Sequence, residues 1–102
     1  MKLFNRKQVI TLAFNTDQEA NRLTEKQRFD LMKKVSQVFG GGSLVENTGS
    51  YLMDNGKAAI EYSYTLTLIG TKKATANKFA QALAKENKQE SYLLNEKLVY
   101  TA

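Results

Sequence analysis

Carboxylates are the first candidates for chemistry in this 102-residue chain, because it contains no histidine and no cysteine. Their absence excludes Ser–His–Asp and Cys–His catalysis, the usual zinc sites and a histidine pH switch. Glu46 and Glu61 are predicted to share an open, solvated sheet face without opposing each other. General acid–base catalysis needs a carboxylate in a concave, partly dry site. We therefore predict no catalytic residue, and no metal site either, since no acidic spacing, Asp54 included, matches a ligand pattern.

Two further patterns are predicted to be structural. The run Gly40-Gly41-Gly42 follows a predicted helix and precedes a strand, whereas phosphate-binding loops precede a helix. We interpret it as a helix stop, because glycine readily adopts the left-handed conformation that ends helices. Tyr51, Tyr62 and Tyr64 are predicted to lie on the helix-covered sheet face. They are therefore expected to pack in the core and not to stack on nucleic-acid bases.

Basic residues are the remaining candidates for a binding surface. The formal net charge is +5, and a basic balance favours a polyanionic partner. Many lysines fall on the outer faces of the two predicted helices, and a basic surface of this kind is able to neutralise phosphates without reading sequence. Helix exteriors are also where lysine ordinarily lies, so an unspecialised solvated surface stays an alternative. The candidate polyanion contacts are Arg28, Lys33, Lys34, Lys78 and Lys85.

Periodicity and capping residues predict the elements that position these side chains. Alternation of period two indicates a strand near the N-terminus, and Thr24 with Gln27 forms a capping-box pattern that begins the first helix. Thr71 is the expected cap of the second helix. The predicted elements are strand 7–14, helix 24–39, strands 43–54 and 57–69, helix 71–87 and strand 90–94, with residues 97–101 either a short return strand or an extension of the last one.

The dipeptide Asn55-Gly56 predicts how the two central strands pair. It is the strongest short hairpin signal, typical of a type I′ turn with two loop residues. That turn places Asn47 opposite Tyr64 and leaves one face mostly apolar. Glu46 and Glu61 fall on the other face, as expected for an antiparallel sheet covered on one side.

The order of elements predicts a single α+β domain over residues 1–102. In a β-α-β-β-α-β, or ferredoxin-like, fold, two helices cover one face of a four-stranded antiparallel sheet. The preference for right-handed crossovers leaves few other topologies.

Two short series resemble a family of small bacterial proteins of unknown function with a ferredoxin-like fold. One runs Gly49-Ser50-Tyr51, Asp54-Asn55-Gly56 and Glu61-Tyr62-Ser63, and the other is Gln89-Glu90-Ser91 followed by Leu93. The resemblance covers residues 29–94, and it supports the topology without assigning a mechanism. It implies a candidate polar cluster, which is either a site or a structural hydrogen-bond network. The cluster consists of Glu61, Ser63, Gln89, Glu90 and Ser91.

These observations together predict a small non-enzymatic protein-binding module that acts by complex formation or by inhibition of a partner. Self-association through the Thr-rich sheet face is a related expectation, and nucleic-acid binding by the basic helix faces is the alternative. A third hypothesis is an enzyme, or a small-ligand binder, built on Glu61 and Glu90. No cofactor is expected. No apolar run is long enough to span a bilayer, and residues 1–7 lack the apolar core of a signal peptide. We expect a cytoplasmic protein, and a composition rich in Lys and Asn fits a phage or mobile-element origin.

Overall fold

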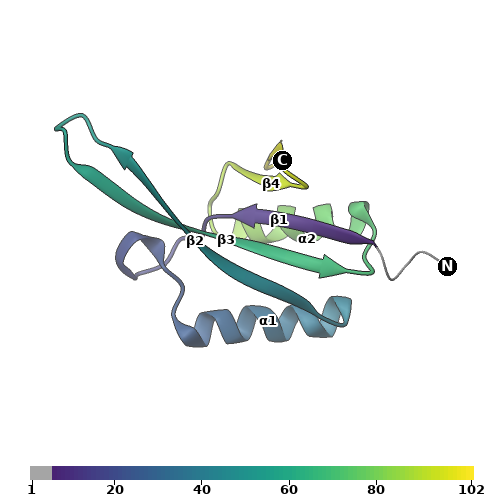
Figure 1. Cartoon of the computed structure of the whole chain (residues 1–102). Coiled ribbons are helices and arrows are strands. Elements are labelled where there is room, and N and C mark those ends of the chain that lie inside the picture. Colours follow the sequence, from purple (N-terminus) through teal and green to yellow (C-terminus); the bar gives the residue numbers. More distant parts are fainter. Residues whose placement is uncertain (1–5) are drawn as a thin grey trace.

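The predicted β-α-β-β-α-β order is present, with one further strand at the C-terminal end (Figure 1). The computed structural model describes residues 6–102. Its elements are β1 (Lys7–Leu12), the short 3-10 helix η2 (Glu19–Asn21), α1 (Glu25–Phe39), β2 (Gly42–Leu52), β3 (Ala58–Ile69), α2 (Lys73–Glu86), β4 (Ser91–Leu94) and β5 (Lys97–Tyr100).

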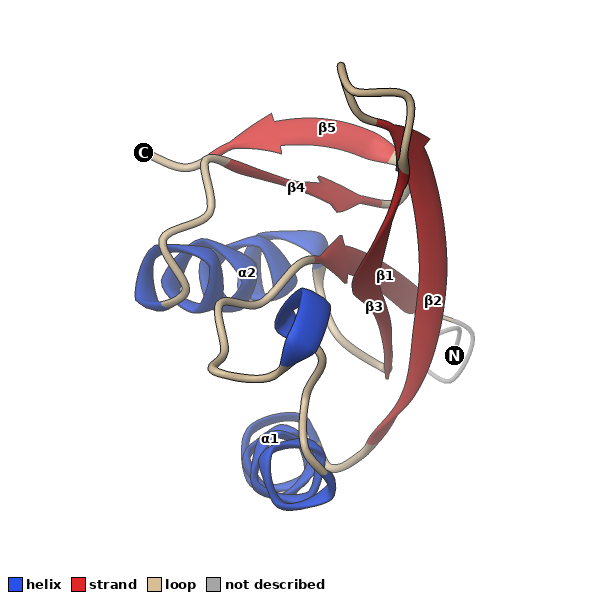
Figure 2. Ribbon diagram, turned by 90° about the vertical axis from the view of Figure 1, so that its left-hand side faces the viewer, coloured by secondary structure: helices blue, strands red, loops and turns tan. Residues whose placement is uncertain are grey.

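The strands form one antiparallel sheet in the order β2-β3-β1-β4-β5. Figure 2 shows α1 and α2 on the same side of this sheet. The α+β class and the ferredoxin-like arrangement are confirmed, but the sheet has five strands where four were predicted. The fifth strand returns along β4 because Asn95 (φ 51°) and Glu96 (φ 68°) both adopt the left-handed conformation. Two consecutive positive φ values are what a two-residue hairpin turn needs.

The core lies between the sheet and the two helices. Ile10, Leu68 and Val35 are fully buried, and Ala76 and Ala80 bring α2 close to the strands. Such small residues let helix and sheet backbones approach, and protein cores of this kind are generally close-packed. Within residues 6–102, neither helix is long and apolar enough to cross a membrane.

The ends of α1 form as the sequence predicts, whereas the start of α2 does not. Thr24 accepts a hydrogen bond from the Gln27 backbone and Gln27 reciprocates, which completes the capping box. Gly40, with φ of 86°, ends the helix. The N-cap of α2 is Lys72 and makes no side-chain capping bond, so the prediction for Thr71 was wrong. Thr71 is instead buried, and its carbonyl accepts a hydrogen bond from Gln8.

The β2–β3 pairing differs by one residue from the prediction. Gly56 (φ 82°) is left-handed and donates its N–H to the Met53 carbonyl, which makes a turn centred on Asp54-Asn55. This is the longer hairpin loop with glycine at its left-handed position, in place of a two-residue turn. Glu46 therefore opposes Tyr64, where Asn47 was expected.

A shift of one residue turns every side chain of a strand to the other face. Glu46 consequently lies on the helix-covered face, while Glu61 stays on the open face opposite Gly49. Tyr51 also moves: it pairs with Ala59 on the open face and is 52% exposed, so its predicted core position was wrong. Since β1 pairs only with the Tyr64–Ile69 part of β3, the rest of the hairpin projects beyond the sheet (Figure 1).

Candidate functional site

Glu46 is the centre of a polar cluster at the base of the projecting hairpin. The Nε and Nη2 atoms of Arg22 donate to its Oε1 and Oε2 atoms, each at 3.0 Å. The Tyr64 hydroxyl donates to Oε1 at 2.7 Å. A guanidinium that grips both oxygens fixes the carboxylate plane as well as its charge. The side chain of Glu46 is 23% exposed, so it remains within reach of solvent.

Tyr64 anchors this cluster to the core. Its residue is only 1% exposed, and its ring packs edge-on against Phe14 with centroids 5.6 Å apart. The buried backbone N–H of Leu23 donates to the Tyr64 hydroxyl at 2.9 Å. The hydroxyl therefore links the segment before α1 to β2 and β3, and it satisfies a donor that has no helical or sheet partner.

Arg22 reaches the cluster from the irregular segment before α1. Its guanidinium carbon lies 4.9 Å from the centroid of the Tyr62 ring. Ala20 and Asn21 precede it with φ values of 53° and 58°, a rare conformation for residues with side chains. Thr16 braces this turn, because its backbone N–H donates to the Asn21 side chain and its hydroxyl donates to the Arg22 carbonyl.

Arg28 is the second cation near the carboxylate. It lies in the first turns of α1, and its Nη1 atom is 3.8 Å from Oε1 of Glu46. At that separation the pair is an ion pair without a hydrogen bond. One carboxylate thus faces two guanidinium groups, of which only that of Arg22 is hydrogen-bonded to it.

These contacts stabilise the charged forms of Glu46 and Arg22 and the neutral form of Tyr64. Hydrogen bonds from Arg22 and then Tyr64 hold the pKa of Glu46 below its ordinary value, and the same pairing raises the pKa of Arg22. Burial, followed by the hydrogen bond to Glu46, raises the pKa of the Tyr64 hydroxyl. Glu46 is therefore a stable anion and a weak base, while Tyr64 is a hydrogen-bond donor and not a nucleophile.

A hollow of about 460 Å³ lies beside this cluster. Its walls combine an aromatic face and aliphatic groups from β3 with polar groups from the turn before α1. They are Glu19, Ala20, Arg22, Ala58, Ile60 and Tyr62. This volume falls within the roughly 300–1,000 Å³ of small-molecule sites. Arg22 lines the hollow and links its apolar wall to the Glu46 carboxylate.

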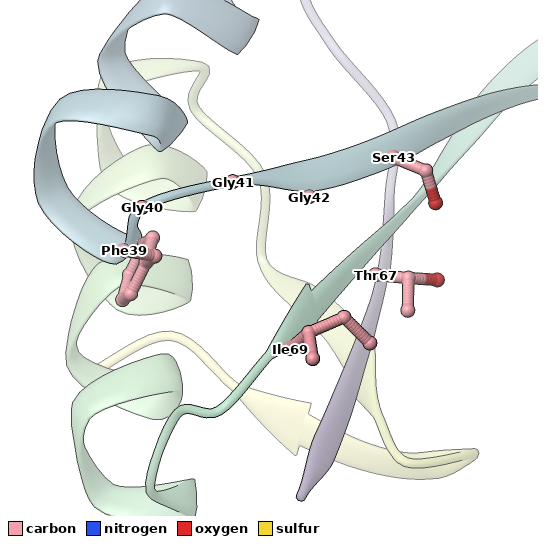
Figure 3. A pocket seen from close by; sticks show the side chains of 7 residues that line it. All are labelled: Phe39, Gly40, Gly41, Gly42, Ser43, Thr67 and Ile69. Carbon is pink, nitrogen blue, oxygen red and sulfur yellow. The ribbon is translucent and has the colours of Figure 1, made fainter. Parts of the chain in front are cut away.

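A second hollow, of about 510 Å³, lies at the end of α1 (Figure 3). It is lined by Phe39, the three glycines 40–42, Ser43, Thr67 and Ile69. Ser43 and Thr67 are cross-strand neighbours, and Figure 3 shows their hydroxyl groups side by side. Among residues 6–102 no ionisable side chain lines it, so this part of the chain brings no acid, base or counter-ion to it. The hollow beside Glu46 is the better candidate site.

The structure does not bring the predicted polar cluster together. Glu61 and Ser63 lie on β3, whereas Gln89, Glu90 and Ser91 lie at or before β4, and β1 separates the two strands. No hydrogen bond joins the two groups within residues 6–102; the Gln89 side chain donates instead to the Asn87 carbonyl. In the same part of the chain, no three acidic residues gather as a metal site would require.

The predicted polyanion contacts divide into two sets. Arg28 is half-buried and faces Glu46, so it belongs to the carboxylate cluster. Lys33, Lys34, Lys78 and Lys85 are exposed on α1 and α2, and the Lys34 ammonium lies 5.8 Å from the Phe79 ring centroid.

Sequence reasoning missed Arg22, Tyr62 and Tyr64 as members of one site. The spacing of Tyr62 and Tyr64 could have indicated that the two tyrosines lie together, because residues two apart in a strand share a face. In the observed register that face also carries Glu46. Nothing in the loop pattern around Arg22 indicated its partner, since the segment has no periodicity.

The comparisons with known proteins give a structural match only. No protein-family model matches the chain. No curated protein sequence matches it either. A phage SAM lyase solved in complex with S-methyl-5'-thioadenosine aligns with a TM-score of 0.58 and 18% identity, covering 93% of this chain and 80% of that one. A structure of phage SAM lyase in the apo state gives a TM-score of 0.57 and 18% identity, covering 93% and 79%.

These matches establish a shared fold, and they contradict the functional prediction. The structural neighbours are enzymes by name, whereas a non-enzymatic binding module was expected, with nucleic-acid binding as the alternative. The physical reason for the error lies in Glu46. The predicted register placed this carboxylate on a wet sheet face, but it lies on the helix-covered face, paired with Arg28 and with Arg22, which lines the hollow.

Proposed function

We propose that the chain is an enzyme that binds S-adenosylmethionine in the hollow beside Tyr62 and cleaves it, releasing S-methyl-5'-thioadenosine. The observation that carries this proposal is the position of Arg22, which lines a hollow, stacks over the Tyr62 ring and is hydrogen-bonded to the ionised Glu46 carboxylate. It occurs in a fold shared with a phage SAM lyase. The substrate's sulfonium is a cation attached to a largely apolar adenosyl group, and this site offers a partner for each part.

The sulfonium is assigned to the Tyr62 ring and the Glu46 carboxylate. An aromatic face attracts a desolvated cation, which is how proteins recognise quaternary ammonium groups. Glu46 supplies the counter-charge, and its lowered pKa keeps it ionised at neutral pH. Tyr62 already lies beneath a cation, the Arg22 guanidinium, at 4.9 Å.

The adenosyl group is assigned to the rest of the hollow. Ala58 and Ile60 provide an aliphatic wall that continues from Tyr62, and Glu19 also lines the hollow. A carboxylate accepts hydrogen bonds from ribose hydroxyls, as acidic residues do in dinucleotide-binding folds. Ile60 is 49% exposed, so covering it with a purine ring removes apolar surface from water and favours binding.

The reaction proceeds without a proton transfer. The bond between sulfur and Cγ of the substrate breaks, and its electron pair stays on sulfur, which becomes the neutral thioether of S-methyl-5'-thioadenosine. The substrate's own carboxylate oxygen forms the new bond to Cγ and closes a five-membered lactone. Elimination to an alkene would instead need a base to remove a proton from Cβ. Glu46 is a weak base with a lowered pKa, so lactone closure is the favoured route.

The protein's contribution to this route is positioning. Holding the carboxylate behind Cγ makes ring closure a near-attack geometry, which is a large part of enzymatic rate enhancement. The opposite charges of sulfonium and carboxylate disappear as the ring closes. The apolar wall of Ala58, Ile60 and Tyr62 favours this neutralisation over the charged ground state.

The test is incubation of the purified protein with S-adenosylmethionine, with both products followed by mass spectrometry. We expect S-methyl-5'-thioadenosine above the rate of a protein-free reaction, together with a lactone. Glu46→Gln and Tyr62→Leu are expected to slow its formation, since each removes one partner of the sulfonium. An alkene product would contradict the lactone route, and product formation at the protein-free rate would refute the proposal.

Glu61→Gln is the matched control for Glu46→Gln. Both carboxylates lie on the same hairpin, but Glu61 occupies the open face. Its substitution is expected to leave the cleavage rate unchanged. Equal loss of activity in both variants would show that hairpin charge, and not the site, controls the reaction.

Four earlier expectations stay predictions beside this proposal. We propose a cytoplasmic location, where S-adenosylmethionine would be supplied, and a phage or mobile-element origin, which the phage source of the neighbours favours. Membership of the uncharacterised bacterial family is a prediction as well. Self-association through the open face, which exposes Val45, Ile69 and Leu98, is tested by sedimentation analysis, and a monomer at all concentrations would contradict it.

A further inference from the structure

The Arg22 guanidinium already occupies a cation position in the site. It forms two hydrogen bonds to Glu46 at 3.0 Å and stacks over the Tyr62 ring at 4.9 Å. An anion and an aromatic face are the two partners that a ligand cation needs. A guanidinium and a second cationic group cannot both lie against the same ring face and the same carboxylate oxygens.

The attachment of Arg22 makes it a displaceable cation. Its side chain is 52% exposed, and it belongs to neither α1 nor any strand. It follows the single-turn helix η2, whose residues Ala20 and Asn21 are left-handed, and this turn is held by backbone bonds such as Arg22 N–H to the Glu19 carbonyl and by the Thr16–Asn21 side-chain bond. Segments of this kind open at low free-energy cost compared with a packed core.

The charge of the site also favours displacement over simple addition. Glu46 faces the guanidinium groups of Arg22 and Arg28, so the cluster already has more positive than negative charge. A third cation entering this cluster would meet net repulsion. If Arg22 moves out to solvent, the entering cation takes over the bonds to Glu46 and the charge of the cluster does not rise.

We infer that Arg22 holds the place of the ligand's cationic group, so that a sulfonium ligand binds by displacing it and a neutral thioether does not. This inference rests on the proposed function and assigns Arg22 as a specificity-determining residue of the same site. Displacement of Arg22 also provides for product release. Once cleavage neutralises the sulfur, nothing competes with Arg22 for Glu46 and Tyr62, and its return expels the product.

The test compares two ligands that differ at sulfur. S-adenosylmethionine carries a sulfonium, whereas S-adenosylhomocysteine has the same adenosyl and amino-acid groups with a neutral sulfur. Calorimetry gives the dissociation constant of each for the wild-type chain and for Arg22→Gln. We expect the preference for the sulfonium to rise by about 3- to 10-fold in the variant, the size of one exposed ion pair plus one cation–π contact.

Lys26→Gln is the matched control. Lys26 is a nearby exposed cation that pairs with Asp30 on α1 and lies outside the cluster. Its substitution removes the same charge and is expected to leave the ligand preference unchanged. A similar rise in both variants would mean that long-range charge, and not displacement, controls the preference, and it would overturn the inference.

The ratio of the two affinities remains informative if the turn loosens in Arg22→Gln, because a damaged hollow weakens both ligands alike. An unchanged ratio, or a lower preference for the sulfonium, overturns the inference and leaves the proposed function standing. Binding of neither ligand to wild type or variant refutes the proposed function, and the inference with it.

Discussion

Replacing Tyr64 by phenylalanine tests how the carboxylate cluster is held. The substitution keeps the buried ring and its edge contact with Phe14 and removes only the hydroxyl. Two hydrogen bonds are lost, one donated to Glu46 and one accepted from the Leu23 N–H. Glu46 keeps its bonds to Arg22 and its access to solvent, so that loss is minor. The Leu23 N–H is left without a partner at a residue only 6% exposed.

The magnitude follows from that orphaned donor. A buried polar group without a partner costs about 1–3 kcal/mol in the free energy of unfolding. Urea unfolding followed by circular dichroism is the assay. With a denaturant slope near 1–2 kcal/mol per molar, as expected for a small domain, the midpoint should fall by about 1 M. The slope itself should not change, because the surface exposed on unfolding is the same.

Tyr62→Phe provides the comparison that can refute this reasoning. Tyr62 is half-exposed on the same strand, and no hydrogen bond of its hydroxyl is found within residues 6–102. Removing that hydroxyl is expected to change stability by less than about 0.5 kcal/mol, as for most surface substitutions. If Tyr64→Phe costs no more than Tyr62→Phe, the hydroxyl is not the link between the segment before α1 and the sheet.

Three further predictions concern the β2–β3 hairpin. In the folded state the pKa of Glu46 lies below its ordinary value of 4.5, so the ionised carboxylate stabilises the fold above that pH. The difference in unfolding free energy between wild type and Glu46→Gln should therefore narrow as the pH falls below about 4.5. Urea unfolding at several pH values measures this gap, and a pH-independent gap would contradict it. Gly42→Ala places a Cβ 2.6 Å from the Thr67 carbonyl oxygen and should cost about 1–3 kcal/mol of stability. The control Gly49→Ala, whose Cβ would lie 3.8 Å from its nearest neighbour, should not destabilise the fold, and equal melting temperatures of the two variants would argue against this packing. Gly56→Ala, at φ 82°, should cost about 1–2 kcal/mol in the same melts, and no loss would argue against the left-handed turn.

The fold was predictable because its signals are local. The capping box at Thr24 and the stop at Gly40 each depend on a few adjacent residues, and both form as the sequence indicates. The alternation in residues 7–14 likewise predicted β1. The strand at the C-terminal end was left open, because whether Asn95-Glu96 turns the chain depends on a conformation that neither residue enforces.

The site was not predictable to the same degree, because it depends on register. The sequence Asp54-Asn55-Gly56 is compatible with two hairpin loops that differ by one residue in length. That single residue decides whether Glu46 faces solvent or the helices. Tyr64 supplies the energetic preference, since in the observed register its buried hydroxyl meets Glu46 and the Leu23 N–H. Such a three-way contact joins segments far apart in the chain and leaves no local pattern.

The prediction of no catalytic residue rested on a premise that the proposed reaction does not meet, namely that catalysis must move protons. A chain without histidine or cysteine lacks the usual groups for moving protons at neutral pH. A sulfonium, however, leaves as a neutral thioether and needs no proton. The substrate's own carboxylate is already ionised, so it is a nucleophile that needs no activating base. What such a cleavage requires is a bound conformation in which the carboxylate approaches Cγ. In the function proposed above, Glu46, Tyr62 and Arg22 form the cation position for that purpose, and none of them has to titrate.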